Sequence, residues 1–325
     1  MESAPFADLV TLIDQYDYFL FDCDGVFWHG DSEIEKGFSA LRHLQSIPGK
    51  HIYLITNNSS RLRETVIKEK LKPLGGEDFE VPLDQIYTSA YITGQYIREN
   101  LIKDDAEASI KKVYVVGQQG LKDELKKAGI QVINDHTNGW APSSDPSMSI
   151  EEFSSMEVDP NVVAVVAGIY HDFNYRTLCI ASLYLQLNNA TFLATNNDRV
   201  FPTHVPDRKC PAGGSIVAAI ASQCPDHQKP QFMGKPNPQI FDIIKREHPH
   251  LKDAPLSKFL MVGDNLQTDI KFGNNCGIDT LVVLSGNASL KQALAAQLSD
   301  DKDSENGKPT HIIPYFSYSQ TLKFD

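Results

Sequence analysis

Short apolar runs, each followed by a segment with helical spacing, recur along the whole chain. Their length and their aromatic and β-branched side chains are typical of buried strands. The runs span residues 18–21, 51–55, 113–116, 162–169, 191–194, 259–262 and 280–284. Strands that alternate with helices in this way predict an α/β fold, a parallel sheet wrapped by helices with its chemistry at the carboxyl ends of the strands.

Two carboxylates, Asp22 and Asp24, end the first of these runs. Side chains two residues apart on a strand point the same way, so both can be presented at one end of a sheet. Like charges this close raise each other's pKa unless a cation lies between them, which indicates a metal site or a shared proton. An ordinary Asp-Gly turn fits the same residues, and this stretch alone does not decide between the two.

The composition limits the kinds of partner. At 325 residues the chain is long enough for about two domains. Its formal net charge of -12 argues against a nucleic-acid or anionic membrane surface. Its five cysteines show no CxxC pair, which favours a reducing compartment, and we expect a cytoplasmic protein. The first residues lack a signal-peptide pattern, and no run of about 18 apolar residues predicts a membrane span.

Four polar clusters follow or flank the predicted core strands, and their order along the chain is distinctive. They are Asp22-Cys23-Asp24-Gly25-Val26, Thr56-Asn57-Asn58-Ser59, Gly234-Lys235-Pro236-Asn237-Pro238 and the sequence GDNLQTD at 263–269. In this order they resemble the haloacid dehalogenase (HAD) superfamily, over roughly residues 16–286. The extended first and third motifs are similar to its 4-nitrophenylphosphatase, phosphoglycolate phosphatase and pyridoxal phosphatase branch. Four ordered motifs are far more specific than any one of them.

The resemblance implies a division of labour among the acidic residues. Asp22 would attack phosphorus and form an aspartyl-phosphate, and Asp24 would act as the general acid and then the general base. Mg²⁺ would be held by Asp22, the backbone carbonyl of Asp24 and the side chain of Asp264. Asp269 would be an outer partner of the metal or a second carboxylate near it. Taken alone, Asp264 also fits a Gly-Asp-Asn turn.

The remaining motifs are predicted to bind phosphate. Thr56, Asn57 and Asn58 follow a strand and precede a helix, where a hydroxyl and backbone N–H groups can bind phosphate oxygens. A simple helix cap fits the same residues and can coexist with phosphate binding. Lys235 would neutralise the phosphate by the family pattern, although in isolation it fits a surface charge.

The resemblance also implies a domain organisation. Residues 1–89 and 231–325 would form a Rossmann-like HAD core, and residues 90–230 an inserted α/β cap of the C2 type that selects the substrate and forms a possible homodimer. Trp28 is interpreted as a packing residue. A loop after a cap strand resembles the substrate-facing loop of the family, although a solvated loop fits equally. Its candidate residues are Asn196, Asp198, Arg199, Phe201 and His204.

These features predict a Mg²⁺-dependent phosphoric monoester hydrolase for small phosphorylated metabolites. Phosphoglycolate is the first candidate substrate and 4-nitrophenyl phosphate an artificial one. The alternatives are a pyridoxal phosphate phosphatase, a protein phosphatase, which a large cap disfavours sterically, and a non-catalytic phosphate-binding regulator. A dehalogenase does not need the acid that Asp24 supplies. Asn265 and Phe27 depart from the common family pattern, which bears on the substrate more than on the chemistry.

Overall fold

The computed structural model describes residues 6–103, 109–135, 145–202, 208–224, 228–299, 301 and 304–317. Contacts divide the chain into two compact units. Unit 1 comprises Met1–Thr56, Glu64–Tyr87 and Lys235–Asp325, and unit 2 comprises Asn57–Arg63 and Thr88–Gly234. The predicted insertion, 90–230, lies inside unit 2. Residues 57–63, which the sequence placed in the first core segment, belong by their contacts to unit 2 as well.

Unit 1 is built on a sheet with the strand order β15-β14-β13-β1-β4-β5. Neighbouring strands are parallel in the pairs β4–β1, β1–β13, β13–β14 and β14–β15, which confirms the predicted fold class. The strands of unit 1, including the separate pair β2 and β3, are β1 (Tyr18–Phe21), β2 (Trp28–His29), β3 (Ser32–Glu33), β4 (His51–Thr56), β5 (Ile86–Thr88), β13 (Phe259–Gly263), β14 (Asp279–Val283) and β15 (His311–Ile313). Its α-helices are α1 (Leu9–Gln15), α2 (Gly37–Ser46), α3 (Arg63–Val66), α4 (Lys72–Gly75), α10 (Gln239–Glu247), α11 (Lys271–Cys276) and α12 (Leu290–Leu298), with π-helical turns at Ile67–Leu71 and Leu266–Ile270.

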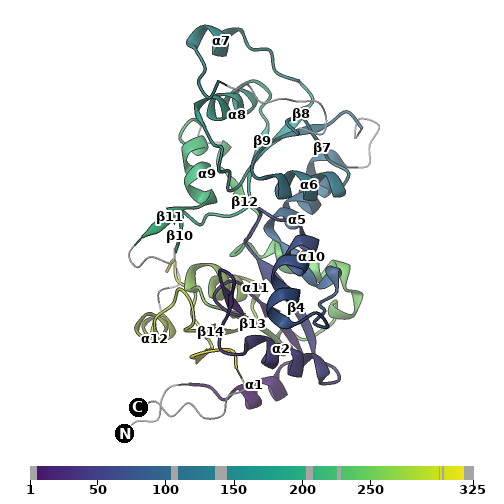
Figure 1. The fold of residues 1–325 in the computed structure, drawn as a ribbon, viewed down its shortest axis with the longest axis vertical. Helices are drawn as coiled ribbons and strands as arrows, with labels where there is room; N and C mark the ends of the chain where they lie inside the picture. The colour runs from purple at the N-terminus through teal and green to yellow at the C-terminus, as the bar shows by residue number, and fades with distance from the viewer. Residues whose placement is uncertain are drawn as a thin grey trace. The chain divides into compact units, whose positions relative to one another are not determined.

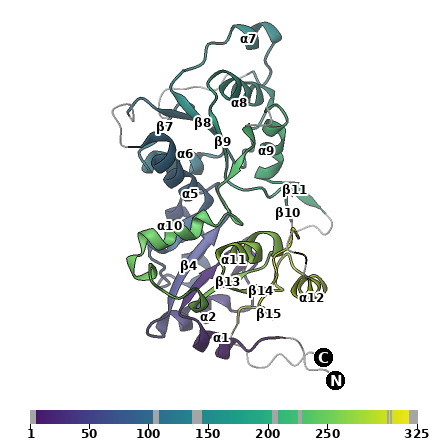
Figure 2. The same ribbon diagram turned by 180° about the vertical axis from the view of Figure 1, so that it is seen from behind.

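Alternation along the buried strands explains how this sheet is covered. Phe19 and Phe21 point to the face that carries α1 and α2, in one apolar cluster with Phe38 and Leu41. Helices α10, α11 and α12 cover the other face (Figures 1 and 2). Strands buried on both faces are apolar throughout, as the sequence of β1 is.

The sheet order sets where the polar strand ends meet. β1 lies between β13 and β4, and Phe21 pairs with Val262 on one side and with Leu54 on the other. The strands are parallel, so the residues that follow them emerge at one edge. Asp22, Thr56 and Asp264 therefore lie at the same edge of the sheet.

Unit 2 contains its own parallel sheet, with the order β12-β9-β8-β6-β7. Helices α8 and α9 cover one face of it and α5 and α6 the other (Figures 1 and 2), and β10 and β11 form a separate antiparallel hairpin. The strands are β6 (Lys112–Val116), β7 (Gln131–Val132), β8 (Val162–Ala167), β9 (Thr191–Ala194), β10 (Val200–Pro202), β11 (Lys209–Pro211) and β12 (Gln231–Phe232). The helices are α5 (Ser89–Tyr96), α6 (Gln119–Lys127), α7 (Ile150–Ser155), α8 (Tyr175–Leu187) and α9 (Gly213–Ala221), with a π-helical turn at Ile97–Ile102.

Segment 57–63 covers the carboxyl ends of β6 and β8. Thr195 Oγ1 donates to Ser59 Oγ at 3.0 Å. A side chain on Gly120 would overlap the Ser60 carbonyl, and a Cβ on Gly168 would lie 2.9 Å from Ser59 Oγ. A sheet of this order commonly binds ligands at that pair of strands. In unit 2 the protein's own chain lies there instead.

The fold contains short elements that the sequence analysis did not predict. Helix α7 begins after Ser149, whose side chain accepts from the Glu152 N–H. The two-residue strands β2, β3, β7 and β12 were not predicted, because strands this short carry no periodic pattern. Among the described residues, no helix combines the length and the apolar character needed to cross a membrane.

A histidine cluster at the amino ends of the unit 1 strands predicts acid sensitivity. The His250 ring lies 4.9 Å from that of His51 and 5.7 Å from that of His248. Burial, and then the charges of these two histidines, lower the pKa of His250. The unfolded chain then binds a proton at higher pH than the folded one, so stability is lost as the pH falls below about 6.5.

We therefore expect His250→Gln to reduce the difference in unfolding free energy between about pH 7.5 and about pH 5.5. Urea denaturation at the two pH values measures this difference. His43→Gln, an exposed position on α2, is the control and should leave it unchanged. An undiminished difference in the His250 variant would show that this cluster does not contribute.

Candidate active site

A buried lysine joins two of the predicted acidic residues. Asp22 follows β1 directly, and its backbone N–H continues the sheet by donating to the Val262 carbonyl. Lys235 Nζ lies 2.7 Å from Asp22 Oδ1, 2.7 Å from Asp269 Oδ1 and 2.9 Å from the Ile55 carbonyl. Lys235 is only 2% exposed. An ammonium buried this deeply requires such partners, which excludes the interpretation of Lys235 as a surface charge.

Asp264 occupies a tight cradle at the end of β13. The backbone N–H and the side-chain amide of Asn287 both donate to Asp264 Oδ2, each at 2.7 Å. Gly25, with a positive φ of 83°, and Gly286 approach so closely that a Cβ on either would overlap the Asp264 carboxylate. The two glycines leave room for this carboxylate, and Asn287 fixes its orientation.

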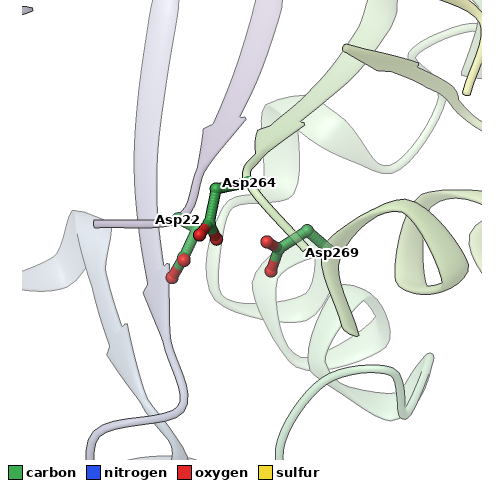
Figure 3. A group of neighbouring side chains, drawn as sticks. All are labelled: Asp22, Asp264 and Asp269. Carbon is green, nitrogen blue, oxygen red and sulfur yellow. The ribbon is translucent and has the colours of Figure 1, made fainter. Parts of the chain in front are cut away.

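The acidic side chains converge on one point. Asp22, Asp264 and Asp269 each offer a carboxylate oxygen, and these oxygens lie within 4.8 Å of one another (Figure 3). With Lys235 included, the fully ionised cluster has a formal charge of -2. A compact set of hard oxygen donors with this charge fits a divalent cation such as Mg²⁺.

The electrostatics agree with that fit. Burial raises the pKa of Asp22 well above its usual range; the Lys235 charge opposes this shift, and the Asp269 and Asp264 charges reinforce it. Burial and Asp269 raise the pKa of Asp264 to about 7, against the hydrogen bonds from Asn287. Burial alone would lower the pKa of Lys235, but Asp22 and Asp269 raise it. The cluster therefore carries more negative charge than Lys235 alone stabilises.

Asp24 differs from these residues in its surroundings. Its side chain is exposed, and its Oδ1 accepts a hydrogen bond of 2.8 Å from Trp28 Nε1. Trp28 is buried and stacks on Phe38, as expected for a packing residue. The hydrogen bond to Asp24 is an additional role that the sequence interpretation missed.

The predicted phosphate-binding segment spans the two units. Thr56 ends β4 in unit 1 and is buried. Asn57 belongs to unit 2, where its carbonyl accepts from Ser89 Oγ and from Asn196 Nδ2, each at 2.8 Å. The side-chain oxygen of Asn58 accepts hydrogen bonds from the backbone N–H and the hydroxyl of Ser60.

The predicted cap residues are only partly brought together. Asn57 Nδ2 lies 3.3 Å from Asp198 Oδ2, so the loop after β9 contacts the Thr56 motif through Asn196 and Asp198. Phe201 lies on the β10–β11 hairpin and is 39% exposed. His204 lies outside the described residues.

Family comparisons match most of the chain. Residues 19–131 match the haloacid dehalogenase-like hydrolase family, and residues 232–317 match an HAD-hydrolase-like family. A 4-nitrophenylphosphatase from Schizosaccharomyces pombe is 34% identical over 84% of this chain and 85% of that protein. The chain belongs to the haloacid dehalogenase-like hydrolases. The predicted superfamily is confirmed.

Further relatives of this hydrolase are also named as phosphatases. Phosphoglycolate phosphatase 1A of Arabidopsis thaliana is 36% identical over 86% of this chain and 71% of that protein. Glycerol-3-phosphate phosphatase of Gallus gallus is 33% identical over 89% and 86%. The crystal structure of a 4-nitrophenylphosphatase from Thermotoga maritima matches with a TM-score of 0.70 and 25% identity, covering 94% of this chain and 96% of that one. The hydrolase is a phosphatase of the HAD family.

The sequence motifs of this phosphatase did not predict the contact between Asn287 and Asp264. Asn287 lies 23 positions after Asp264 and follows β14, outside the four motifs. Its position after the strand next to β13 was the available signal, because residues that follow neighbouring parallel strands meet at one edge.

Proposed function

We propose that this phosphatase hydrolyses small phosphomonoesters with Mg²⁺, through an aspartyl-phosphate on Asp22. The observation that carries the proposal is the buried cluster of Asp22, Asp264, Asp269 and Lys235. Its excess negative charge suits a divalent cation, and its edge-of-sheet position suits a site of phosphoryl transfer.

The metal would be held by the side chains of Asp22 and Asp264 and by the backbone carbonyl of Asp24. When bound, Mg²⁺ supplies positive charge to the transferring phosphoryl group. Asp269 is assigned a supporting role, because its Oδ1 contacts Lys235 at 2.7 Å and its Oδ2 accepts from the Asn265 N–H at 3.0 Å.

Asp22 carries out the first chemical step. Its carboxylate oxygen attacks phosphorus and the bond from phosphorus to the leaving oxygen breaks, while Asp24 transfers its proton to that oxygen. Asp24 then takes a proton from the water that hydrolyses the aspartyl-phosphate. Lys235 stabilises negative charge on Asp22 and on the phosphoryl oxygens.

Substrate choice is assigned to unit 2. We propose that residues 90–230 form a C2-type cap, that Phe201 contacts the substrate, and that Thr56, Asn57 and Asn58 bind phosphate oxygens. Phosphoglycolate is the first candidate, and the relatives named phosphoglycolate phosphatase and glycerol-3-phosphate phosphatase support small phosphorylated metabolites. The cytoplasmic location and a homodimer formed through the cap are proposed from the sequence alone.

A substrate panel tests the function. Purified protein in Mg²⁺ buffer is assayed with phosphoglycolate, glycerol 3-phosphate, pyridoxal phosphate, 4-nitrophenyl phosphate and a phosphotyrosine peptide. We expect the small phosphate esters to have the highest kcat/KM. A preference for the peptide would instead support a protein phosphatase, and absence of all turnover would support a non-catalytic phosphate-binding protein.

Asn287 gives a test of the metal site that does not depend on turnover. We expect Asn287→Ala to weaken Mg²⁺ binding about 10-fold, because groups that orient a metal ligand typically contribute this much. Isothermal titration of the chelator-treated protein with Mg²⁺ measures the change. Asn306→Ala, at an exposed position, is the control. Equal affinities for the two variants would remove Asn287 from the site.

A further inference from the structure

Trp28 contacts the proposed general acid through its polar atom. Its Nε1 donates to Asp24 Oδ1 at 2.8 Å, although Asp24 is exposed and Trp28 is only 2% exposed. A buried indole N–H needs an acceptor, and this one finds it in a carboxylate at the edge of the proposed site.

The Trp28 ring is held firmly from several directions. It stacks on Phe38 with ring centroids 6.2 Å apart and an interplanar angle of 13°, and it also contacts Phe27. Its backbone carbonyl accepts from the Gly25 N–H at 2.9 Å, and Trp28 pairs with Glu33 between β2 and β3. The donor atom therefore has a fixed position, unlike a donor on a flexible surface side chain.

We infer that Trp28 is a positioning residue that selects which oxygen of Asp24 delivers the proton to the leaving group. An indole nitrogen only donates, and the carbonyl oxygen of a protonated carboxyl group is a better acceptor than its hydroxyl oxygen, so the hydrogen bond to Asp24 Oδ1 favours the acidic proton on Oδ2. The hydrogen bond also restrains rotation of the carboxyl group. The inference rests on the role of Asp24 in the proposed function.

The consequence appears in the leaving-group dependence of the first step. In that step the Asp22 oxygen forms a bond to phosphorus, the ester oxygen leaves, and the Asp24 proton moves to it. A 4-nitrophenolate leaves readily without this proton, whereas phenolate and alkoxides, which are stronger bases, depend on it. Loss of a correctly oriented acid should therefore affect phenyl phosphate more than 4-nitrophenyl phosphate.

The experiment compares kcat/KM for these two substrates in Mg²⁺ buffer. kcat/KM reports steps only through the first irreversible one, so the later role of Asp24 as a base does not enter. We expect Trp28→Phe to lower kcat/KM about 10-fold for phenyl phosphate and less than about 3-fold for 4-nitrophenyl phosphate. Replacing Trp28 by 3-benzothienylalanine removes the N–H and keeps the ring shape, which preserves the test if the Phe variant folds poorly.

Two controls separate positioning from packing. Phe38→Leu removes the ring that stacks on Trp28 but keeps the N–H and the pairing of Trp28 with Glu33, so it should change the ratio of the two rates less than Trp28→Phe does. Asp24→Ala should change the ratio of the two rates by more than Trp28→Phe does. Adding Trp28→Phe to the Asp24→Ala protein should then have no further effect on the ratio.

The outcomes distinguish this inference from the proposed function. If Asp24→Ala changes the ratio and neither replacement of Trp28 does, Trp28 has no positioning role and the proposed function stands. If Asp24→Ala leaves the ratio unchanged, Asp24 is not the acid, and both assignments are overturned. A ratio change by Trp28→Phe that persists without Asp24 would also overturn the inference.

Discussion

Asp22→Asn is expected to lower the hydrolysis of 4-nitrophenyl phosphate at least about 10³-fold, because the amide cannot serve as the nucleophile that forms the covalent intermediate. The substitution nearly preserves the shape of the side chain and removes one negative charge from a buried cluster with a formal charge of -2. The fold should therefore be retained. Release of 4-nitrophenolate measures the rate, and thermal unfolding measures the fold.

The matched control for this variant is Asp17→Asn. Asp17 is also an aspartate paired with a lysine, with Lys50 Nζ at 3.0 Å, but it precedes β1 rather than following it. It should retain full activity. Borohydride reduction during turnover should also trap an acyl-phosphate on residue 22 of the unsubstituted enzyme. Unimpaired, Mg²⁺-dependent turnover by Asp22→Asn would show that the nucleophile is another residue.

Removal of divalent metal is expected to have the second largest effect. Treatment with EDTA should lower activity at least about 100-fold, and added Mg²⁺ should restore it. Without the cation, the transferring phosphoryl group lacks the positive charge that Mg²⁺ supplies. Metal binding to the folded state should also stabilise it by about 2.7 kcal/mol at a concentration 100 times the dissociation constant. Thermal unfolding with and without Mg²⁺ measures this second effect.

Asp264→Asn separates a specific metal site from a general salt effect. The variant should lose most of the stabilisation by Mg²⁺, because Asp264 is 2% exposed and contributes one of the clustered oxygens. Asp78→Asn, whose side chain is 81% exposed, should keep that stabilisation in full. Full activity of the unsubstituted protein in metal-free buffer would refute the metal proposal.

Asp264 should make the metal-free protein less stable as the pH rises, whereas the histidine cluster makes the protein less stable as the pH falls. The pKa of Asp264 is raised to about 7 by burial and by Asp269, so the folded state holds a proton that the unfolded state has released. Stability from this group is therefore lost as the pH rises from about 4 to about 7. In the presence of Mg²⁺ the carboxylate is bound as an anion, and this loss should disappear.

The order of motifs in the sequence was sufficient to identify the family and the α/β class. Asp22 and Asp264 follow apolar runs that are strands in the structure, β1 and β13, and these strands are neighbours. A buried parallel strand requires a nearly continuous apolar sequence, so its end is visible as an abrupt change to polar residues. This is why strand ends, and the candidate acidic residues that lie on them, were predictable.

Other contacts depend on the folded geometry, which no periodic pattern encodes. Asn287 reaches Asp264 because β14 lies beside β13, and Trp28 reaches Asp24, four residues away, because the chain turns back at Gly25. Segment 57–63 groups with unit 2 because Ser59 and Asn57 bond to residues after β9. Hydrogen bonds of this kind are set by tertiary geometry and leave no periodicity in the sequence.

By itself, the sequence determined the fold class, the family and the residue types available for phosphoryl transfer, because strand burial and chemical function both constrain which residues can stand at given positions. Only the tertiary structure decided how those residues are held: Lys235 between two carboxylates, Asp264 between two glycines and Asn287, and Asp24 against Trp28. The reason is physical. A pKa, a hydrogen bond or an available ligand oxygen depends on distances of a few ångströms between side chains, whether the residues are far apart in the chain, as Lys235 and Asp22 are, or close, as Asp24 and Trp28 are.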